Sequence, residues 1–442
     1  MGFRFTFILL LLTCVLSAPV HAAGSAVHAA GQEGANQSVL SFKEYTTRLF
    51  ERNPDLKMLN SALSAAMEVP ARAGSLQDPM VSFGVMNLPS DSFSFDKDGM
   101  TQKQLALSQS FPAPGKRALR REIAEYDIEI KSAAVPEKRL DLLENVWILF
   151  LRLDYLEKTR STVMSNREVL AGFVKVALAK YSVGSGLQQD VLRAQTEVSK
   201  MEADLLDIEE EIGTVKAKLA LLADLPFKTD FSKADPPRLL AREGRLDTFV
   251  KEADENRPRF KALRSAIAKA GKGVELSRRD NLPDYSVKLS YSQRDAVPGG
   301  TERDNLVSAT VSAAIPVWKN SRQDRKIAED INLQEAARQR YESEKLNLRI
   351  KLASLLETEE KKSKSLAIYD EALLVQAVQT VDATFSAYQV NKVDFLSLVT
   401  SQITVFNHEI KRNMVDYRLQ AARVTLLRTI GEGLMEVSNV GQ

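Results

Sequence analysis

Few residues of this chain are of the types that perform catalysis or bind metal ions. The sequence contains three histidines, His21, His28 and His408, and a single cysteine, Cys14. Isolated histidines make neither a zinc site nor an acid–base centre, because both need several side chains brought together. The sequence also shows no nucleophile beside a base and no glycine-rich phosphate loop, which argues against an exported enzyme. It therefore predicts a protein that is not an enzyme and that has no metal ion or other cofactor.

The first 22 residues have the form of a secretory signal peptide that is cleaved after export. Arg4 precedes an apolar run from Phe5 to Leu16, and the run is followed by the small-residue exit VHA at residues 20–22. This run is too short for a membrane span, which is why a cleaved signal is preferred to the alternative of an N-terminal membrane anchor. Cys14 lies in the run, so the mature chain is predicted to carry neither an acylated cysteine nor a disulfide.

The composition favours long helices over compact globular domains. Only 20 of the 442 residues are glycine and 15 are proline, whereas 27% are charged. Long tracts rich in Ala, Leu, Glu, Lys and Arg are typical of coiled coils. The formal charge is +2 and the two signs are interspersed, which predicts no nucleic-acid partner.

The chain contains two copies of one plan. NPDL at residues 53–56 is matched by RPRF at 257–260, a spacing of 204 (258 − 54) that matched segments continue up to Ile123. YSVG at 181–184 is echoed by YQVN at 388–391, a spacing of 207 (388 − 181), so the second copy contains a three-residue insertion. The predicted organisation is a signal peptide at 1–22, a first repeat at 23–222, a connecting segment at 223–245, a second repeat at 246–433 and a C-terminal tail at 434–442.

Each copy contains two strand-like segments, which predict β-hairpins at 79–112 and 283–316. In the first, Val81, Phe83 and Val85 alternate with small residues, and the other strands alternate in the same way. Strands of about ten residues with one apolar face fit the wall of a transmembrane β-barrel, and a soluble hairpin with one buried face is the alternative. Four strands cannot close a barrel in lipid without unpaired edges, so the barrel must be shared between protomers.

A long helical hairpin follows each β-hairpin, at residues 116–222 and 319–433. Pro136 is the only proline in the two long outgoing helices, residues 116–180 and 319–388, and it should kink or break the first of them. Each returning helix carries apolar residues at steps of three and four, which predict a coiled coil or simple packing in a helical bundle. They are Val198, Met201, Leu205, Ile208, Ile212, Val215, Leu219 and Leu222 in the first copy, and Leu396, Val399, Ile403, Phe406 and Ile410 in the second.

Taken together, these features resemble the TolC-type outer membrane factor family, the exit ducts of tripartite efflux pumps and type I secretion systems. The resemblance covers nearly the whole mature chain and rests on its duplication and on the motifs DPMVSFGVMNLP (78–89), SQSFPAPGKR (108–117), YSVGSG (181–186) and DVLRAQ (190–195). It implies a homotrimer in which every protomer adds its strands to one barrel. The predicted fold is mainly α with a membrane β-barrel: long antiparallel α-helical coiled-coil hairpins and four transmembrane β-strands per protomer form a trimeric α/β-barrel tunnel.

The resemblance also implies a function, a location and partners. It implies a passive duct in the cell outer membrane that extends into the periplasm, with a periplasmic adaptor, an inner-membrane transporter and outer membrane lipid as partners. The DPM, NLP and PGK wording is closest to the heavy-metal branch, so heavy-metal cations and a transporter of the RND type are expected. Drugs and other organic compounds, or proteins of a type I secretion system, are alternative substrates. A periplasmic adaptor is another alternative for the chain itself, but it predicts one helical hairpin instead of two.

Carried over residue by residue, the resemblance places adaptor-docking tips at two turns. The matching residues are Tyr181, Val183, Gly184, Ser185 and Gly186 in the first turn, and Tyr388, Val390 and Asn391 in the second. The glycines also serve simply to make the turn, and Asn391 can replace a glycine because both accept a left-handed backbone. Asp190 and Asp394 lie close to the tips. In a trimer each forms a ring of three carboxylates at the aperture, or each only caps its returning helix.

Overall fold

The computed structural model describes residues 40–231, 236–296, 299–300 and 302–431. These residues belong to one compact unit of the chain. The predicted signal peptide at 1–22 and the predicted tail at 434–442 lie outside the described residues. Within the described ranges, no helix is both long enough and apolar enough to cross a membrane.

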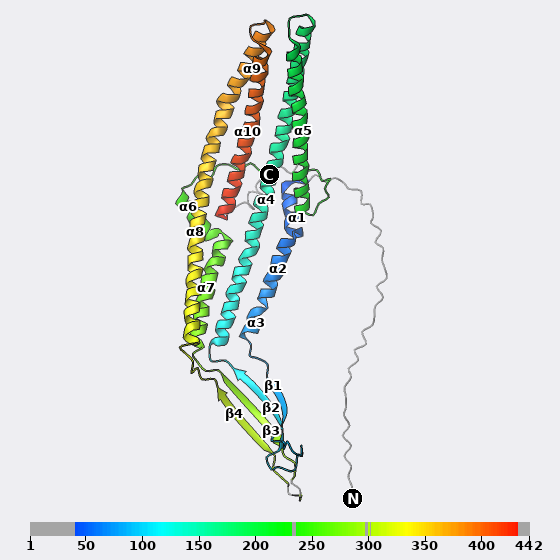
Figure 1. The fold of residues 1–442 in the computed structure, drawn as a ribbon. Coiled ribbons are helices and arrows are strands. Elements are labelled where there is room, and N and C mark those ends of the chain that lie inside the picture. Colours follow the sequence, from blue (N-terminus) through cyan, green and yellow to red (C-terminus); the bar gives the residue numbers. More distant parts are fainter. Residues whose placement is uncertain (1–39, 232–235, 297–298, 301, 432–442) are drawn as a thin grey trace, which may run out of the picture. The chain divides into compact units, whose positions relative to one another are not determined.

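Most of the described residues lie in helices (Figure 1). Pro54 and Pro258 open α2 and α7, where the missing N–H leaves no intrahelical bond unmade. Ser41 caps α1, and the Glu44 carboxylate in return accepts from the Ser41 amide at 2.8 Å. The helices are α1 (Phe42–Arg52), α2 (Pro54–Met67), α3 (Val69–Gly74), α4 (Lys116–Ser182), α5 (Gln188–Leu222), α6 (Leu246–Asn256), α7 (Pro258–Arg279), α8 (Gln323–Ile368), the π-helical turn η1 (Tyr369–Leu373), α9 (Leu374–Gln389) and α10 (Phe395–Ile430).

Four antiparallel strands form one sheet in the order β1-β2-β3-β4. They are β1 (Met80–Met86), β2 (Gln102–Phe111), β3 (Tyr285–Gln293) and β4 (Leu306–Ala313), all within the hairpins that the sequence predicts. The central pair, β2 and β3, joins the two repeats, with Leu107 opposite Leu289. Each of β1 and β4 pairs on one side only, so both outer edges of the sheet carry unpaired backbone groups in the described chain.

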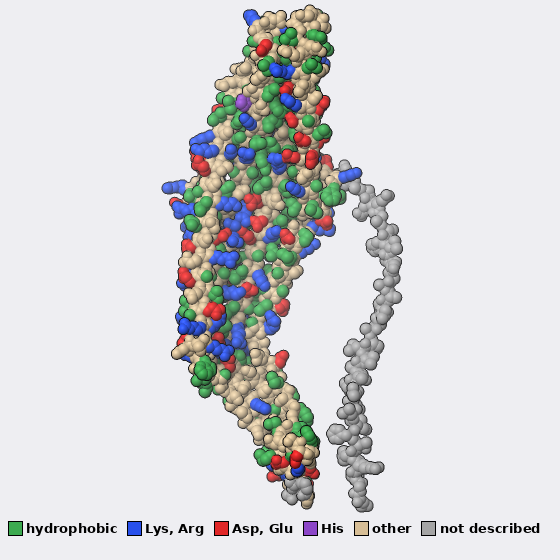
Figure 2. All heavy atoms as spheres, viewed as in Figure 1, with side chains coloured by type: hydrophobic (Ala, Val, Ile, Leu, Met, Phe, Trp, Pro, Cys, Tyr) green, Lys and Arg blue, Asp and Glu red, His purple; other side chains and the backbone are tan. Residues whose placement is uncertain are grey.

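The two faces of the sheet differ in character. The register brings most of the large apolar side chains to one face, and these are exposed to solvent in the single chain: Val81, Phe83, Val85, Leu105, Leu107, Phe111, Tyr285, Leu289, Tyr291, Val307 and Val311. The opposite face is mostly small or polar, with Met80, Met86 and Leu306 at strand ends, and includes Ser82, Gly84, Gln104, Ala106, Ser286, Ser290, Ser308 and Ser312. Figure 2 shows charged side chains of both signs over the helices and few over the strands.

The two β-hairpins are not paired in equivalent register. Phe83 faces Leu105 in the first hairpin, whereas its repeat equivalent Val287 faces Val311 in the second. Phe83 and Val287 are 204 residues apart in the chain (287 − 83). Their partners, Leu105 and Val311, are 206 residues apart (311 − 105). The spacing of 204 predicted up to Ile123 therefore holds for β1 and β3 and is wrong for β2 and β4, because two residues enter between β3 and β4.

The long helices show the same two-residue shift. Lys138 of α4 pairs with Asp55 of α2, and Glu344 of α8 pairs with Arg259 of α7. The partners on the short helices are 204 residues apart (259 − 55), whereas those on the long helices are 206 apart (344 − 138). The turns beyond them are 207 apart (388 − 181). The last residue of the insertion enters at η1, since a π-turn holds one residue more than an α-turn.

The two long outgoing helices differ from the prediction in opposite ways. The sequence predicts a kink or a break at Pro136, and the break is absent, because α4 runs through this residue without interruption. Directly beyond this proline, Glu137 accepts hydrogen bonds of 2.7 and 3.0 Å from Arg257, the N-cap residue of α7. The second helix, predicted as one regular run over 319–388, begins at Gln323 and is interrupted by η1.

The largest buried side chains lie where α1 packs on α4 and α5. Trp147 and Phe150 of α4 contact Phe42 edge-on, with ring centroids 5.0 and 5.6 Å apart. The buried Tyr45 hydroxyl donates to the Leu219 carbonyl of α5 at 2.7 Å. This cluster holds α1 against the first helical hairpin.

The apolar residues predicted to face inward on α5 do so. All eight, from Val198 to Leu222, are buried or half-buried. In α10 the inward-facing series begins one residue earlier than predicted, because Leu396 is 47% exposed whereas Phe395 and Leu398 are buried. The ring of Phe395 packs against another aromatic ring at the preceding turn, which fixes this rotation of the helix.

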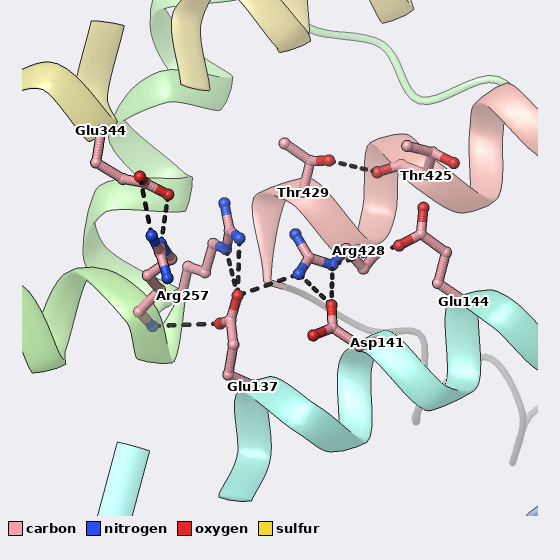
Figure 3. A network of polar contacts seen from close by, with 9 residues as sticks. Glu137, Asp141, Glu144, Arg257, Glu344, Thr425, Arg428 and Thr429 are labelled. Carbon is pink, nitrogen blue, oxygen red and sulfur yellow. Dashed lines mark hydrogen bonds and ion pairs between the residues drawn. The ribbon is translucent and has the colours of Figure 1, made fainter. Parts of the chain in front are cut away.

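A network of buried charges joins α4 to α7 and α10 (Figure 3). Glu137 accepts hydrogen bonds from Arg257 at 2.7 Å and from Arg428 at 3.2 Å, and the three side chains are only 15%, 9% and 10% exposed. Arg428 also pairs with Asp141 and Glu144. Every one of these charges has a partner, which offsets the free-energy cost of removing it from water.

Candidate functional site

The predicted tip residues lie in two turns that join antiparallel helices. The first turn connects α4 to α5 and the second connects α9 to α10. Both turns lie at the same end of the described unit, and the sheet lies at the other end of the long helices (Figure 1). Each repeat therefore contributes the ends of two helices to the site, α4 and α5 from the first repeat and α9 and α10 from the second.

Local backbone chemistry makes the first turn. Gly184 has a left-handed backbone (φ +75°), and the Ser185 amide donates to the Lys180 carbonyl at 2.9 Å. A Cβ on Gly186 would lie 3.0 Å from the Lys180 Cβ, so the chain returns too closely for a side chain. Tyr181 and Val183 remain exposed, at 45% and 76%. The glycines thus form the turn and leave an apolar surface at its tip.

The second turn has the same backbone plan with different side chains. Asn391 is left-handed (φ +60°), as expected for a residue that replaces a glycine, and its amide donates to the Tyr388 carbonyl at 3.1 Å. Tyr388 is only 5% exposed, unlike its counterpart Tyr181, and its ring lies 5.5 Å from that of Phe395. Val390 is 63% exposed. The two turns are therefore similar in backbone and unequal in surface.

Lys180 links the two turns. Its ammonium group donates to the Tyr388 carbonyl at 2.6 Å and to the Asn391 side-chain oxygen at 2.5 Å, and it lies 4.2 Å from the centre of the Tyr388 ring. The sequence did not point to this residue, because its repeat equivalent is Ala387 and a lone lysine before a turn carries no signal. The first hairpin thus holds the second through one side chain.

The two aspartates near the tips occupy different helix positions. Asp394 is the N-cap of α10 and accepts from the Ser397 amide at 2.8 Å. Hydrogen bonds from Ser397 hold the pKa of Asp394 below its ordinary value. Asp190 lies in the first turn of α5, where Leu187 is the N-cap, so Asp190 does not cap its helix. Burial, and to a smaller extent the charge of Asp190, raises the pKa of Tyr388.

The exposed side chains of the two turns are largely apolar. No group of three or more His, Cys, Asp or Glu side chains in the described part of the chain is arranged to hold a metal ion. The exposed tip side chains Val183, Leu187 and Val390 are apolar, and backbone groups near them are used by the turns. Such a surface suits contact with another protein chain.

Comparisons with known proteins agree with this architecture. The family model described as "Outer membrane efflux protein" matches residues 249–432. The resemblance to outer membrane efflux proteins is confirmed. A search of curated proteins finds no match.

Several solved structures, among them an outer-membrane channel and an outer membrane protein, share the fold over most of the chain. The outer-membrane channel OprN superposes with a TM-score of 0.76 and 16% identity, covering 89% of this chain and 90% of its own. VceC from Vibrio cholerae gives 0.75 and 16%, covering 89% and 96%. CusC gives 0.75 and 14%, covering 89% and 92%. The likeness thus extends to the first repeat, which the family model does not match.

Proposed function

We propose that the protein is the outer membrane channel of a tripartite efflux system, a passive exit duct that works as a homotrimer. The observation that carries this proposal is an open four-stranded sheet with an exposed apolar face, followed by long helical hairpins that end in exposed turns. The fold shared with OprN, VceC and CusC supports it.

The sheet is proposed to be one part of a membrane barrel. Its apolar face, which includes Phe83 at 76% and Val307 at 79% exposure, suits contact with lipid tails, and its small polar face suits a water-filled interior. Unpaired backbone groups are costly in lipid, so the free edges of β1 and β4 need strands from other copies. The helices then extend into the periplasm, and the predicted signal peptide is consistent with export.

The turns are proposed to dock a periplasmic adaptor that connects the duct to an inner-membrane transporter. Val183 and Val390 offer apolar contacts on the two turns. The same turns are proposed to form the aperture, where Asp190 and Asp394 of three copies give rings of carboxylates. For Asp394 this role is additional to capping α10.

Heavy-metal cations are proposed as the substrate class and an RND-type transporter as the pump. The sequence motifs at residues 78–89 and 108–117 support this choice. Drugs, other organic compounds or secreted proteins are the alternative substrates. A strain lacking the gene, with and without the gene restored, should lose resistance to copper, silver, zinc, cobalt or cadmium salts. Loss of resistance to organic compounds alone would contradict the metal assignment.

A second test addresses location and docking. The protein should be recovered from the outer membrane fraction as a detergent-soluble trimer, and N-terminal sequencing should begin near residue 23. Val183→Asp should abolish restored resistance, whereas Leu240→Asp, which alters an 87% exposed apolar residue far from the turns in the chain, should not. Recovery of a water-soluble monomer would argue against the duct. Equal effects of the two variants on resistance would argue against docking at the turns.

A further inference from the structure

The apolar face of the sheet continues past β4 into the turn before α8. Ile315 lies four residues after Val311, which keeps the alternation of the strand, and it is 75% exposed. Val317 and Trp318 come next and are also largely exposed. Trp318 is one of only two tryptophans in the chain, and the other, Trp147, is fully buried. An exposed indole at the end of an apolar strand surface is typical of a residue at a membrane interface.

Two arginines lie directly beside this apolar turn. The Arg322 amide donates to the Trp318 carbonyl at 3.0 Å, which sets Arg322 one turn from the indole. Arg325 follows three residues later and lies on the same side of the helix start. Both arginines are exposed, and both border the same cavity of about 700 Å³ as Val317 and Trp318. Figure 2 shows Lys and Arg side chains next to hydrophobic ones where the helices meet the sheet.

These two guanidinium groups have no counter-charge in the part of the chain that the structure describes, since neither makes a hydrogen bond or an ion pair there. The carboxylates that border the cavity are engaged by other cations. Asp280 and Asp284 both pair with Lys116. Glu329 pairs with Lys326. The planar fork of an arginine side chain matches the oxygen atoms of a phosphate group, so the free pair suits an anion of this kind.

The first repeat shows how the chain itself can complete such a junction. Lys116 begins α4 shortly after the end of β2, and it is buried to 3% exposure. Its ammonium group pairs with Asp284 at 2.8 Å and with Asp280 at 3.2 Å. At the start of α8, no carboxylate of the described residues takes this role for Arg322 or Arg325. An anion from outside the chain can therefore take it.

We propose that the cavity bordered by Trp318, Arg322 and Arg325 binds the phosphate group of a membrane phospholipid. The two guanidinium groups bind the phosphate oxygens, the indole lies at the level of the headgroup, and the acyl chains run along Ile315 onto the apolar face of the sheet. A lipid is preferred to a free phosphate ion because the cavity opens onto the exposed apolar side chains of Val317 and Trp318. The inference rests on the proposed duct and adds a lipid site at the edge of its membrane part.

The first test measures lipid binding to the trimer, purified in mild detergent, by native mass spectrometry. The probe is phosphatidylglycerol, of which the parent should bind one molecule per chain, and the variant is Arg322→Gln with Arg325→Gln. Each basic residue near an anionic headgroup changes the affinity about fivefold, so the double variant should bind the lipid about 25-fold more weakly than the parent. The matched control is Arg338→Gln with Arg340→Gln. It removes two exposed arginines about 20 Å further along α8 and should bind as the parent does.

Two further probes identify the chemistry of the ligand. Diacylglycerol has the acyl chains without the phosphate, and it should bind equally weakly to the parent and to the double variant. Inorganic phosphate should not displace phosphatidylglycerol from the parent. Displacement by inorganic phosphate would show a site for free anions and overturn the assignment to a lipid. Equally tight binding of diacylglycerol and phosphatidylglycerol would show that the phosphate is not recognised, which would overturn the proposal as well.

Tryptophan fluorescence tests where the site lies in the membrane. In phosphatidylglycerol vesicles, brominated lipids should quench Trp318 more strongly when the bromine is attached near the headgroup than when it is attached at the end of the acyl chain. Trp318→Leu leaves only the buried Trp147 and supplies the background signal. Equal quenching by the two lipids, or no quenching, would place the indole away from the headgroup and overturn the proposal.

The lipid site and the duct would fail in different ways. A trimer recovered from outer membranes whose affinity for phosphatidylglycerol is the same in the parent and in Arg322→Gln with Arg325→Gln would overturn the lipid site and leave the duct intact. A water-soluble monomer that binds no lipid would overturn both proposals.

Discussion

Replacing Lys180 by methionine should release the second turn from the first. Methionine keeps an unbranched apolar side chain but loses the ammonium group that donates to the Tyr388 carbonyl and the Asn391 side chain, at 2.6 and 2.5 Å. A hydrogen bond from a charged donor contributes about 1.5–3 kcal/mol, and the half-buried position of Lys180 reduces this gain. A loss of about 1.5 kcal/mol corresponds to about a tenfold shift in the local opening equilibrium.

Hydrogen exchange measured by mass spectrometry can read this shift directly. Protection of the amides in residues 388–394 should fall about tenfold in Lys180→Met, because those amides exchange through local opening. Lys175→Met is the matched control, since Lys175 is an exposed lysine of the same helix with no described partner, and it should leave protection unchanged. Protection in the sheet should be the same in all three proteins. Equal protection of residues 388–394 in the two variants would refute the link.

Three further outcomes follow from the described contacts. Glu137→Ala removes the carboxylate that faces the buried Arg257, and it should lower the free energy of unfolding by about 3–5 kcal/mol in denaturant titrations. Gly186→Ala should lower the melting temperature because a Cβ lies 3.0 Å from a neighbouring side chain, whereas Gly172→Ala, within a helix and with open space around it, should raise stability by about 0.5–1 kcal/mol. Burial raises the pKa of Glu409, so its charge destabilises the fold above that pKa. Glu409→Gln should therefore melt at a higher temperature than the parent at pH 7, and the difference should shrink as the pH falls through the raised pKa and vanish below the ordinary value of 4.5.

Patterns of short period were sufficient to predict the elements of this fold. Alternation placed all four strands, and steps of three and four residues placed the inward face of α5. The glycine and asparagine of the two turns also behaved as their backbone preferences require. Each of these features depends on residues close together in the chain, which is why one sequence carried enough information.

Features that depend on tertiary contacts were mispredicted or missed. Propensity alone predicts that Pro136 disrupts α4, but contacts to α2 and α7 directly beyond it support the helix. The first inward residue of α10 was set by the packing of Phe395 on Tyr388. Lys180 bonds to groups more than two hundred positions away, and nothing near it in sequence marks that partner. Asp190 and Asp394 looked alike in sequence although only Asp394 caps a helix.

The π-turn η1 has a consequence for the rotational phase of the second hairpin. One extra residue in a regular α-helix rotates everything beyond it by about 100° about the helix axis. By widening one turn, η1 absorbs that residue, and α9 keeps the face that packs on α10. Deleting one residue within Tyr369–Leu373 should therefore leave a continuous α-helix in phase with its neighbours. A one-residue deletion in the middle of α4 should instead turn its buried side chains out of the core.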